Sequence, residues 1–196
     1  MDLRSPKLNK IIDTWIEEDL GNGDLTRYVL NNRNASAHWI AKEDGTFCGG
    51  ELIKLIFQKI DPQVDIQLLI KDGEIFEKNQ RLLELKGPST SLVAGERVTL
   101  NVAMHLSGIA TSTALLVTKL SGSNVKLADT RKTTPGIRVF EKYAFRCGGG
   151  INHRLGLDDA AMLKENHIEW SKGIRESIET LKTTIPWTKK IIVEAE

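Results

Sequence analysis

The second half of the chain contains three short apolar segments, each ending in polar or charged residues. These segments are 125–128, 160–163 and 190–196. A helix-like repeat of apolar residues lies between the last two segments. Strands that alternate with helices in this way are typical of a parallel α/β barrel, which carries its chemistry at the carboxyl ends of its strands. Residues 112–196 therefore predict the first part of an open α/β barrel.

Residues 1–111 lack this alternation. Their pattern predicts a separate α+β domain of the sandwich type. Leu8, Ile12 and Trp15 lie at helical spacing, and the turn cluster at 21–24 ends that helix. Further patterns predict strands at 35–43, 64–68 and 81–86, a helix at 51–60, and helices at 89–106 and 109–120. The last two are separate helices in this prediction because Ser107 and Gly108 interrupt the pattern. The chain is therefore expected to be an α/β protein of two domains.

The net charge of the protein is too small to attract a charged partner from a distance. The net charge is +1, with 27% charged and 40% hydrophobic residues, so attraction to an anionic partner must be local, and neither nucleic acid nor a membrane is an expected partner. No apolar run approaches the roughly 20 residues of a membrane span. Cys48 and Cys147 lie far apart, at no metal-ligand spacing, and are interpreted as small buried or loop residues. A reducing cytoplasm is the default compartment.

Cationic side chains gather in residues 129–167, beside the triple glycine at 148–150. Among them are Arg131, Lys132, His153, Arg154, Lys164 and His167. Arginine binds carboxylates and phosphates in a bidentate manner, while lysine acts as a point charge. Neither histidine stands at a metal-ligand spacing, but both suit hydrogen bonding to a carboxylate. The cluster favours a pocket for a small, multiply anionic molecule over a solvated face with surface ion pairs.

Two carboxylates, Glu194 and Glu196, share one face of the last predicted strand. Such a pair suits stabilisation of a developing positive charge, or binding of Mg²⁺ together with substrate oxygens. The alternative is a frayed strand, since Glu196 is the last residue. Glu96 and Arg97, in the middle of a predicted helix, are by themselves an ordinary surface pair.

Six motifs together resemble the quinolinate phosphoribosyltransferase family in order and spacing. They are EDLGNGDLT (18–26), GERVTLN (95–101), LSGIAT (106–111), DTRKTTPG (129–136), EKYAFRCGGGINHRLGLDDA (141–160) and KENHI (164–168). The combination of DTRKTTPG with GGG-x-NHR is the most specific of these. One departure is Glu165, where the family has Asp, which keeps the charge on a longer side chain.

The resemblance implies transfer of phosphoribosyl from phosphoribosyl pyrophosphate to quinolinate, with Mg²⁺. The implied products are nicotinate mononucleotide, pyrophosphate and carbon dioxide, in NAD synthesis. It also implies homodimers or higher homo-oligomers, in which the N-terminal domain of one subunit covers the barrel of the other.

Site residues follow from the resemblance position by position. Arg131, His153 and Arg154 are expected to bind quinolinate, with Arg97 reaching in from the partner subunit. Lys132 and Lys164 are expected to contact quinolinate or the phosphates and to act in catalysis. Glu194 is expected to stabilise the ribosyl cation, and Glu194 and Glu196 are possible metal ligands.

The family continues with further strands and phosphate-binding loops beyond the third barrel strand. The chain is therefore expected to cover the N-terminal two-thirds of the family and to lack part of the phosphoribosyl pyrophosphate and Mg²⁺ site. Three alternatives stay open: a non-catalytic binding or assembly subunit, the molybdenum-transport-associated relative of the family, and a nucleic-acid binder. Only the local cations motivate the last, and the near-neutral net charge argues against it.

Overall fold

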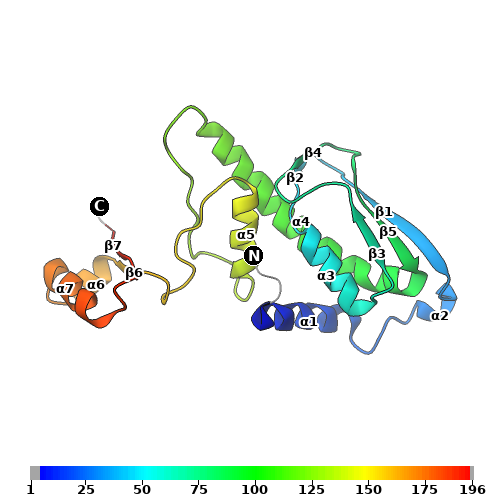
Figure 1. The fold of residues 1–196 in the computed structure, drawn as a ribbon, viewed down its shortest axis with the longest axis horizontal. Helices are drawn as coiled ribbons and strands as arrows, with labels where there is room; N and C mark the ends of the chain where they lie inside the picture. Colours follow the sequence, from blue (N-terminus) through cyan, green and yellow to red (C-terminus); the bar gives the residue numbers. More distant parts are fainter. Residues whose placement is uncertain (1–4, 195–196) are drawn as a thin grey trace. The chain divides into compact units, whose positions relative to one another are not determined.

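Residues 5–194 are described by a computed structural model, in which the chain divides into two units. Unit 1 comprises Met1–Asp129 and Thr134–Ile151, and unit 2 comprises Thr130–Thr133 and Asn152–Glu196. The predicted boundary between residues 111 and 112 falls inside the long helix α4 (Ser89–Lys119). Figure 1 labels the elements along the chain.

Unit 1 contains a three-stranded antiparallel sheet in the order β1-β5-β3. The strands are β1 (Asn34–Ile40), β3 (Asp65–Leu68) and β5 (Arg81–Pro88). Leu83 and Leu85 of the central strand are buried, and Leu85 lies opposite Ala37 on one side and Ile66 on the other. The three predicted strands are confirmed. A second, two-stranded antiparallel sheet joins β2 (Gly45–Thr46) and β4 (Ile75–Phe76).

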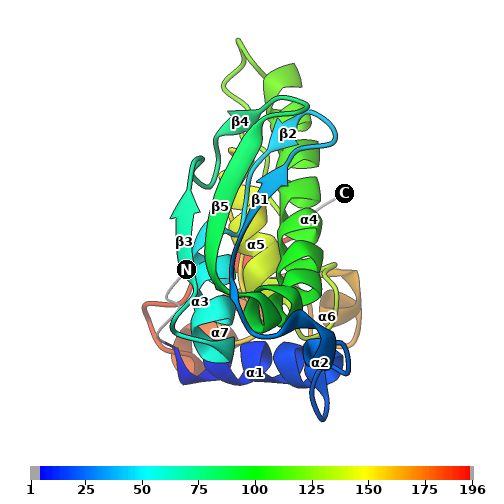
Figure 2. The ribbon, with the colours of Figure 1, turned by 90° about the vertical axis from the view of Figure 1, so that its right-hand side faces the viewer.

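Helices cover one face of the larger sheet (Figure 2). Besides α4, unit 1 contains α1 (Pro6–Leu20), α2 (Arg27–Leu30), α3 (Gly50–Ile60) and α5 (Arg138–Cys147). Phe47 and Phe57 fill the core against the sheet, whereas Ile12 and Phe140 belong to a second core that α1, α3, α4 and α5 form. The helices predicted at 8–16 and 51–60 are confirmed, because in both the apolar repeat faces a core.

The prediction of two helices around Ser107 and Gly108 is wrong, because α4 continues without interruption through both residues. Glycine in a helix interior costs about 1 kcal/mol relative to alanine. Packing offsets this cost, since Leu106 and Ala110 on either side are buried in the core. Ser107 also accepts a hydrogen bond through Oγ from the backbone N–H of Cys48 at 3.0 Å.

Helix α4 is also long and apolar enough to cross a membrane, with a mean hydropathy of 1.4 over 18 residues. The sequence did not predict such a segment, because polar residues such as Glu96 and Arg97 interrupt the apolar residues of this helix. In the structure, eight residues of α4 are buried and the helix contributes to both cores of unit 1. A core helix can meet the same criteria of length and composition as a membrane span, so these criteria alone do not make α4 a membrane span.

Gly95 is the point where α4 meets the fully buried ring of Phe57, and a Cβ at this position would lie 2.3 Å from the ring. We expect Gly95→Ala to lower the free energy of unfolding by about 1–3 kcal/mol through overpacking. This loss exceeds the roughly 1 kcal/mol gain in helix propensity. Gly108→Ala is the matched control, because no atom lies within 4 Å of its Cβ position, and it is expected to stabilise the chain. Equal urea midpoints for the two variants would contradict the prediction.

Unit 2 contains two parallel strands, β6 (Ala161–Leu163) and β7 (Ile191–Val193), with the helices α6 (Glu165–Glu169) and α7 (Ile174–Thr184) between them in the chain. The predicted second and third strands and the helix between them are therefore confirmed. Together with unit 1 they form the mixed α/β fold that was predicted.

The strand predicted at 125–128 is wrong, because this segment forms only an isolated parallel bridge between Ala128 and Ile151. The side chain of Val125 is 62% exposed, so the start of the segment has no apolar surface against which to pack. Its end is nevertheless held, since the N–H of Asp129 donates to the carbonyl oxygen of Ile151 at 3.1 Å.

Candidate active site

Unit 2 holds most of the residues that the sequence singled out. Arg131 and Lys132 come from its short first segment, and four more come from the part after Ile151, namely His153, Arg154, Lys164 and Glu194. Arg97 is exposed on α4 in unit 1. Glu196 lies outside the described residues. Two segments separated by about twenty residues thus contribute to one compact unit.

Lys164 and Glu194 meet at the carboxyl ends of the two parallel strands. The register places Leu163 opposite Val193, so the residues that follow them lie side by side. Lys164 Nζ is 2.7 Å from Glu194 Oε2, and about half of each side chain is exposed, 45% and 50%. An ion pair this exposed contributes little to stability, so its position at the strand ends is the more informative property.

Arg131 has a buried Nε atom with no hydrogen-bond partner within residues 5–194. Buried donors of this kind are rare in folded proteins, and each requires an explanation. A guanidinium group is always charged and binds carboxylates and phosphates through paired N–H groups. The neighbouring Lys132 is exposed, whereas Arg131 is only partly exposed, so the two adjacent cations differ in solvent exposure.

Two adjacent residues of α5 hold both ends of the segment that carries Arg131 and Lys132. Before the segment, Lys142 forms an ion pair with Asp129, with Nζ 2.5 Å from Oδ1 and side chains only 2% and 7% exposed. After it, Glu141 Oε2 accepts a hydrogen bond from the backbone N–H of Thr134 at 3.0 Å. Sequence analysis missed both residues, although they begin the motif EKYAFRCGGG. We name this arrangement the α5 clamp, comprising Glu141 and Lys142 with their partners Asp129 and Thr134.

Glu141 also contacts His105 of α4, with Oε1 2.9 Å from Nε2. Burial alone would raise the pKa of Glu141, but the hydrogen bonds from Thr134 and His105 outweigh burial and lower its pKa below the ordinary value of 4.5. The carboxylate is therefore charged at neutral pH. Its contribution to the clamp is lost only as the pH falls through that lowered pKa.

Arg154 and His153 are placed at the other end of β6. Arg154 donates through Nη1 to the carbonyl oxygen of Ala160 at 2.8 Å, and its backbone N–H donates to His153 Nδ1 at 2.8 Å. In the part of the chain that the structure describes, no hydrogen bond or ion pair joins Arg154 to Lys164 or Glu194. His167 instead helps to cap α6, where its Nδ1 accepts the backbone N–H of Lys164 at 3.2 Å.

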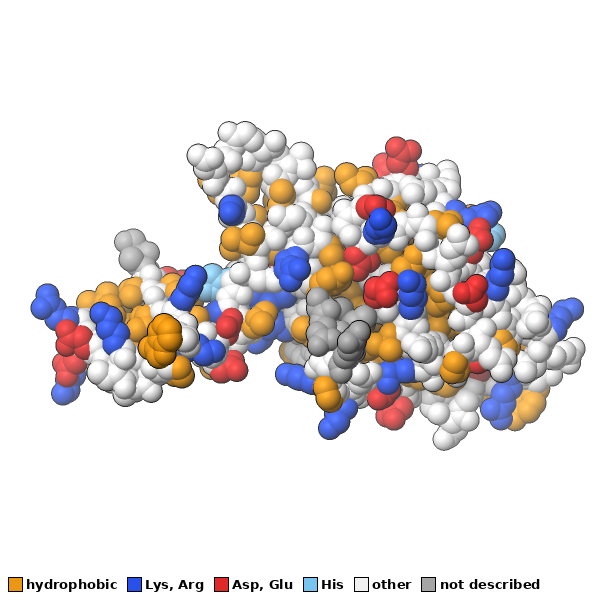
Figure 3. Space-filling model, viewed as in Figure 1, with side chains coloured by type: hydrophobic (Ala, Val, Ile, Leu, Met, Phe, Trp, Pro, Cys, Tyr) orange, Lys and Arg blue, Asp and Glu red, His pale blue; other side chains and the backbone are white. Residues whose placement is uncertain are grey.

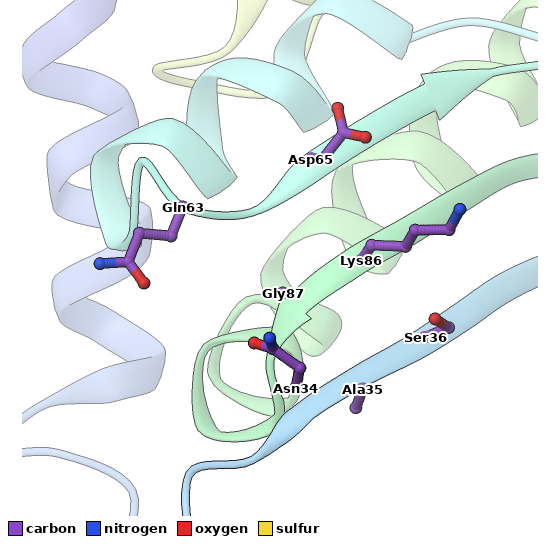
Figure 4. Close-up of a pocket in the computed structure, with 7 residues that line it drawn as sticks. All are labelled: Asn34, Ala35, Ser36, Gln63, Asp65, Lys86 and Gly87. Carbon is purple, nitrogen blue, oxygen red and sulfur yellow. The ribbon is translucent and has the colours of Figure 1, made fainter.

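The surface of unit 1 has several hollows. One of about 450 Å³ is on the polar outer face of the sheet, where Asp65 and Lys86 lie opposite each other in register (Figure 4). A larger groove of about 1040 Å³ runs between β1 and α4 and is mostly apolar. On the face in Figure 3, acidic and basic side chains are interspersed over unit 1, so this face presents no extended field of one sign.

Two family models match the chain. The model of the quinolinate phosphoribosyl transferase N-terminal domain matches residues 24–107, and that of the C-terminal domain matches residues 109–196. The chain belongs to the quinolinate phosphoribosyltransferase family. The resemblance in the six sequence motifs is thereby confirmed over almost the whole chain.

Curated and solved relatives support the assignment to this family. The chain is 43% identical over 189 residues to the probable carboxylating nicotinate-nucleotide pyrophosphorylase of Synechocystis, and 42% identical over 191 residues to that of Bacillus subtilis. The alignments cover 94% and 97% of the chain but 64% and 66% of these relatives, so the chain spans about two thirds of their length.

The crystal structure of NadC from Streptococcus pyogenes matches with a TM-score of 0.92 at 38% identity, covering 97% of the chain and 68% of that protein. The nicotinate-nucleotide pyrophosphorylase of Francisella tularensis matches with a TM-score of 0.93 at 37% identity, covering 96% of the chain and 67% of that protein. The predicted fold class of this quinolinate phosphoribosyltransferase family member is therefore confirmed.

Proposed function

We propose that this protein transfers phosphoribosyl from phosphoribosyl pyrophosphate to quinolinate, with loss of carbon dioxide, giving nicotinate mononucleotide and pyrophosphate for NAD biosynthesis. The observation that carries the proposal is the Lys164–Glu194 pair at the carboxyl ends of adjacent parallel strands, in a member of this family. This is the end of the strands at which α/β barrels place their chemistry.

Arg131 is the proposed principal contact to quinolinate. Quinolinate carries two carboxylates, and the buried Nε of Arg131, which has no partner among the described residues, offers a donor that one of them can accept. His153 and Arg154 add donors from the second segment of unit 2, and Lys132 supplies an exposed charge for quinolinate or a phosphate group.

Glu194 is the proposed stabiliser of the ribosyl group as pyrophosphate leaves. The leaving step creates an oxocarbenium-like ribose, and a fixed carboxylate lowers the energy of that positive charge. Lys164 holds the Glu194 carboxylate in place at 2.7 Å and offers its charge to the substrate anions. Once the ring nitrogen is ribosylated it is cationic, so the adjacent carboxylate can leave as carbon dioxide while the protein orients and desolvates it. The electron pair of the broken bond stays on the ring carbon beside the cationic nitrogen, and a proton from water then replaces the carboxylate.

Mg²⁺ is the proposed metal ion of this reaction. The residues fit it, because Mg²⁺ usually takes one or two protein carboxylates together with substrate phosphates and water, and Glu194 offers one carboxylate at the strand ends. Glu196, outside the described residues, is the second proposed ligand. When bound, the ion would neutralise charge on the pyrophosphate.

We also propose a homodimer or higher homo-oligomer in which Arg97 reaches the site of the partner subunit. Its exposed position on α4 supports this role, since it leaves the guanidinium accessible to another chain. The proposed compartment is the cytoplasm, which suits two free cysteines.

Turnover of quinolinate by the purified protein tests the reaction. The assay contains phosphoribosyl pyrophosphate, Mg²⁺ and quinolinate that is labelled in the leaving carboxyl group. We expect labelled carbon dioxide and nicotinate mononucleotide in equal amounts. Omission of phosphoribosyl pyrophosphate is the control, because decarboxylation should require ribosylation first. Quinolinate binding without turnover would instead favour a binding or assembly subunit.

Arg131→Ala is expected to weaken quinolinate binding by about 10- to 100-fold, since a hydrogen bond to a charged group contributes roughly 1.5–3 kcal/mol. Isothermal titration calorimetry measures the change. Arg131→Lys should recover only part of the affinity, because lysine keeps the charge but not the paired donors. Arg175→Ala removes an exposed arginine of α7 and is the matched control. Equal affinity in the Arg131→Ala and Arg175→Ala variants would contradict the role of Arg131.

A further inference from the structure

A second group of reactive side chains lies in unit 1, around Cys48 and Cys147. Cys48 lies just before α3, and Cys147 is the last residue of α5, directly before the triple glycine. Their Sγ atoms and a carboxylate oxygen of Asp72 all lie within 4.8 Å of one another. Both thiols are free. Ninety-nine positions separate the two cysteines in the sequence, so only the tertiary fold brings them together.

We propose that Cys48 and Cys147 are an oxidisable pair, in which a peroxide oxidises Cys147 and Cys48 then closes an intrachain disulfide bond.

The carboxylate of Asp72 already accepts hydrogen bonds from within unit 1, which favours a thiol pair over a metal site. Its Oδ1 accepts the backbone N–H groups of Gly49 and Gly50 at 2.9 Å each, at the start of α3. Its Oδ2 accepts the hydroxyl of Tyr143 at 2.7 Å. The carboxylate thus satisfies donors of a helix N-terminus that would otherwise lack partners. A metal ion would compete with these bonds and would also require removal of both thiol protons.

The two thiols differ in exposure and in acidity, which sets the order of reaction. Cys48 is fully buried, and the hydrogen bond with Cys147 together with burial raises its pKa. The same hydrogen bond lowers the pKa of Cys147, although partial burial and the negative charge of Asp72 oppose this shift, and the Tyr143 hydroxyl and the Arg146 charge add to it. Because the thiolate is the nucleophile, Cys147 is the group that reacts first with an oxidant.

The chemistry balances with one peroxide molecule. The Cys147 thiolate attacks one peroxide oxygen, the O–O bond breaks, and hydroxide leaves and takes up the former thiol proton to form water, leaving a sulfenic acid. The sulfur of Cys48 then attacks the Cys147 sulfur, the S–O bond breaks, and a second water leaves with the Cys48 proton. Two thiols lose two electrons in all, and the peroxide gains them.

The backbone on either side holds both cysteines against α4. At Gly148, a Cβ would lie 2.4 Å from the carbonyl oxygen of Ala110, so the residue after Cys147 is in close contact with the helix. On the other side, the backbone N–H of Cys48 donates to Ser107 at 3.0 Å. Both main chains are thus anchored at the same helix, with the two Sγ atoms within 4.8 Å of each other. The disulfide bond would then tether the start of the triple-glycine loop.

Peroxide treatment followed by mass spectrometry tests the proposal. In the wild type we expect loss of both titratable thiols, a mass decrease of two hydrogens in the monomer, and a linked peptide pair that contains Cys48 and Cys147. A thiol reductant should reverse all three changes. Each readout is chemical, so the result does not depend on enzymatic activity.

Single variants test the order of reaction. In Cys48→Ala the sulfenic acid at Cys147 cannot be resolved and should be trapped by a cyclic dione probe. In Cys147→Ala we expect the Cys48 thiol to be labelled at least about tenfold more slowly than the Cys147 thiol is labelled in Cys48→Ala. A tenfold difference in rate corresponds to one pKa unit. Tyr143→Phe keeps the ring and removes the hydroxyl, so it should slow oxidation of Cys147 in a protein with the native fold. If a cysteine variant fails to fold, the oxidation rate of Tyr143→Phe still tests the proposal.

Several results would overturn the proposal, and the first three concern the thiols themselves. They are retention of both thiols under peroxide in the wild type, disulfides formed only between chains, and equal labelling rates in the two cysteine variants. Stoichiometric Zn²⁺ that co-purifies with the wild type and protects both thiols would also overturn it, and would make the cluster a metal site instead.

Discussion

Lys142→Met is expected to lower the free energy of unfolding by about 3–5 kcal/mol, the usual cost of removing one partner from a buried ion pair. Lys142 is 2% exposed and its partner Asp129 is 7% exposed, so the variant leaves a carboxylate with little access to water. Urea unfolding followed by circular dichroism measures the change. Lys172→Met is the matched control, because Lys172 is 81% exposed in its ion pair with Glu176 and should change stability by less than about 1 kcal/mol.

The double variant Lys142→Met with Asp129→Leu separates the charge effect from the loss of packing. When apolar residues replace both partners, the buried carboxylate is removed together with the lysine, and much of the lost stability should return. A double variant as unstable as Lys142→Met alone would show that the lysine acts through its packing rather than through Asp129. Quinolinate affinity should also fall in Lys142→Met, because the α5 clamp holds the segment that carries Arg131.

Glu194→Gln is expected to reduce kcat by about 10²–10³, the loss that follows removal of one electrostatic contact to the transition state. The substitution preserves the shape of the side chain but removes the charge that stabilises the ribosyl cation in the proposed reaction. Steady-state kinetics should show the loss in kcat with little change in KM, because the cation exists only in the transition state. A change confined to KM would contradict this role.

Two further variants control this experiment. Glu176→Gln removes a carboxylate from the exposed Lys172–Glu176 pair on α7 and should leave kcat unchanged. Lys164→Met combined with Glu194→Gln should cost less than the sum of the single losses, because the two side chains are in contact at 2.7 Å. The stability of all these variants should stay within about 1 kcal/mol of the wild type, since the pair is half exposed.

The sequence by itself determined the features that depend on neighbouring positions in the chain. The apolar repeat of α1 and the strand character of β5 follow from side chains a few residues apart, and both appear as predicted. The sequence also predicted that Lys164 and Glu194 follow the ends of two short strands, and only the structure pairs these strands as neighbours. The family motifs singled out the remaining cations as candidate site residues.

Tertiary structure alone decided the features that depend on distant partners. Helix α4 continues through Gly108 because the neighbouring residues are buried, and packing outweighs a local cost of about 1 kcal/mol. The segment 125–128 does not form a strand, because it gains a bridge only at Ala128. The α5 clamp and the pair of Cys48 with Cys147 join residues that are 7 to 99 positions apart. Such contacts form only when the packing of whole helices brings the partners together, and no local pattern in the chain encodes them.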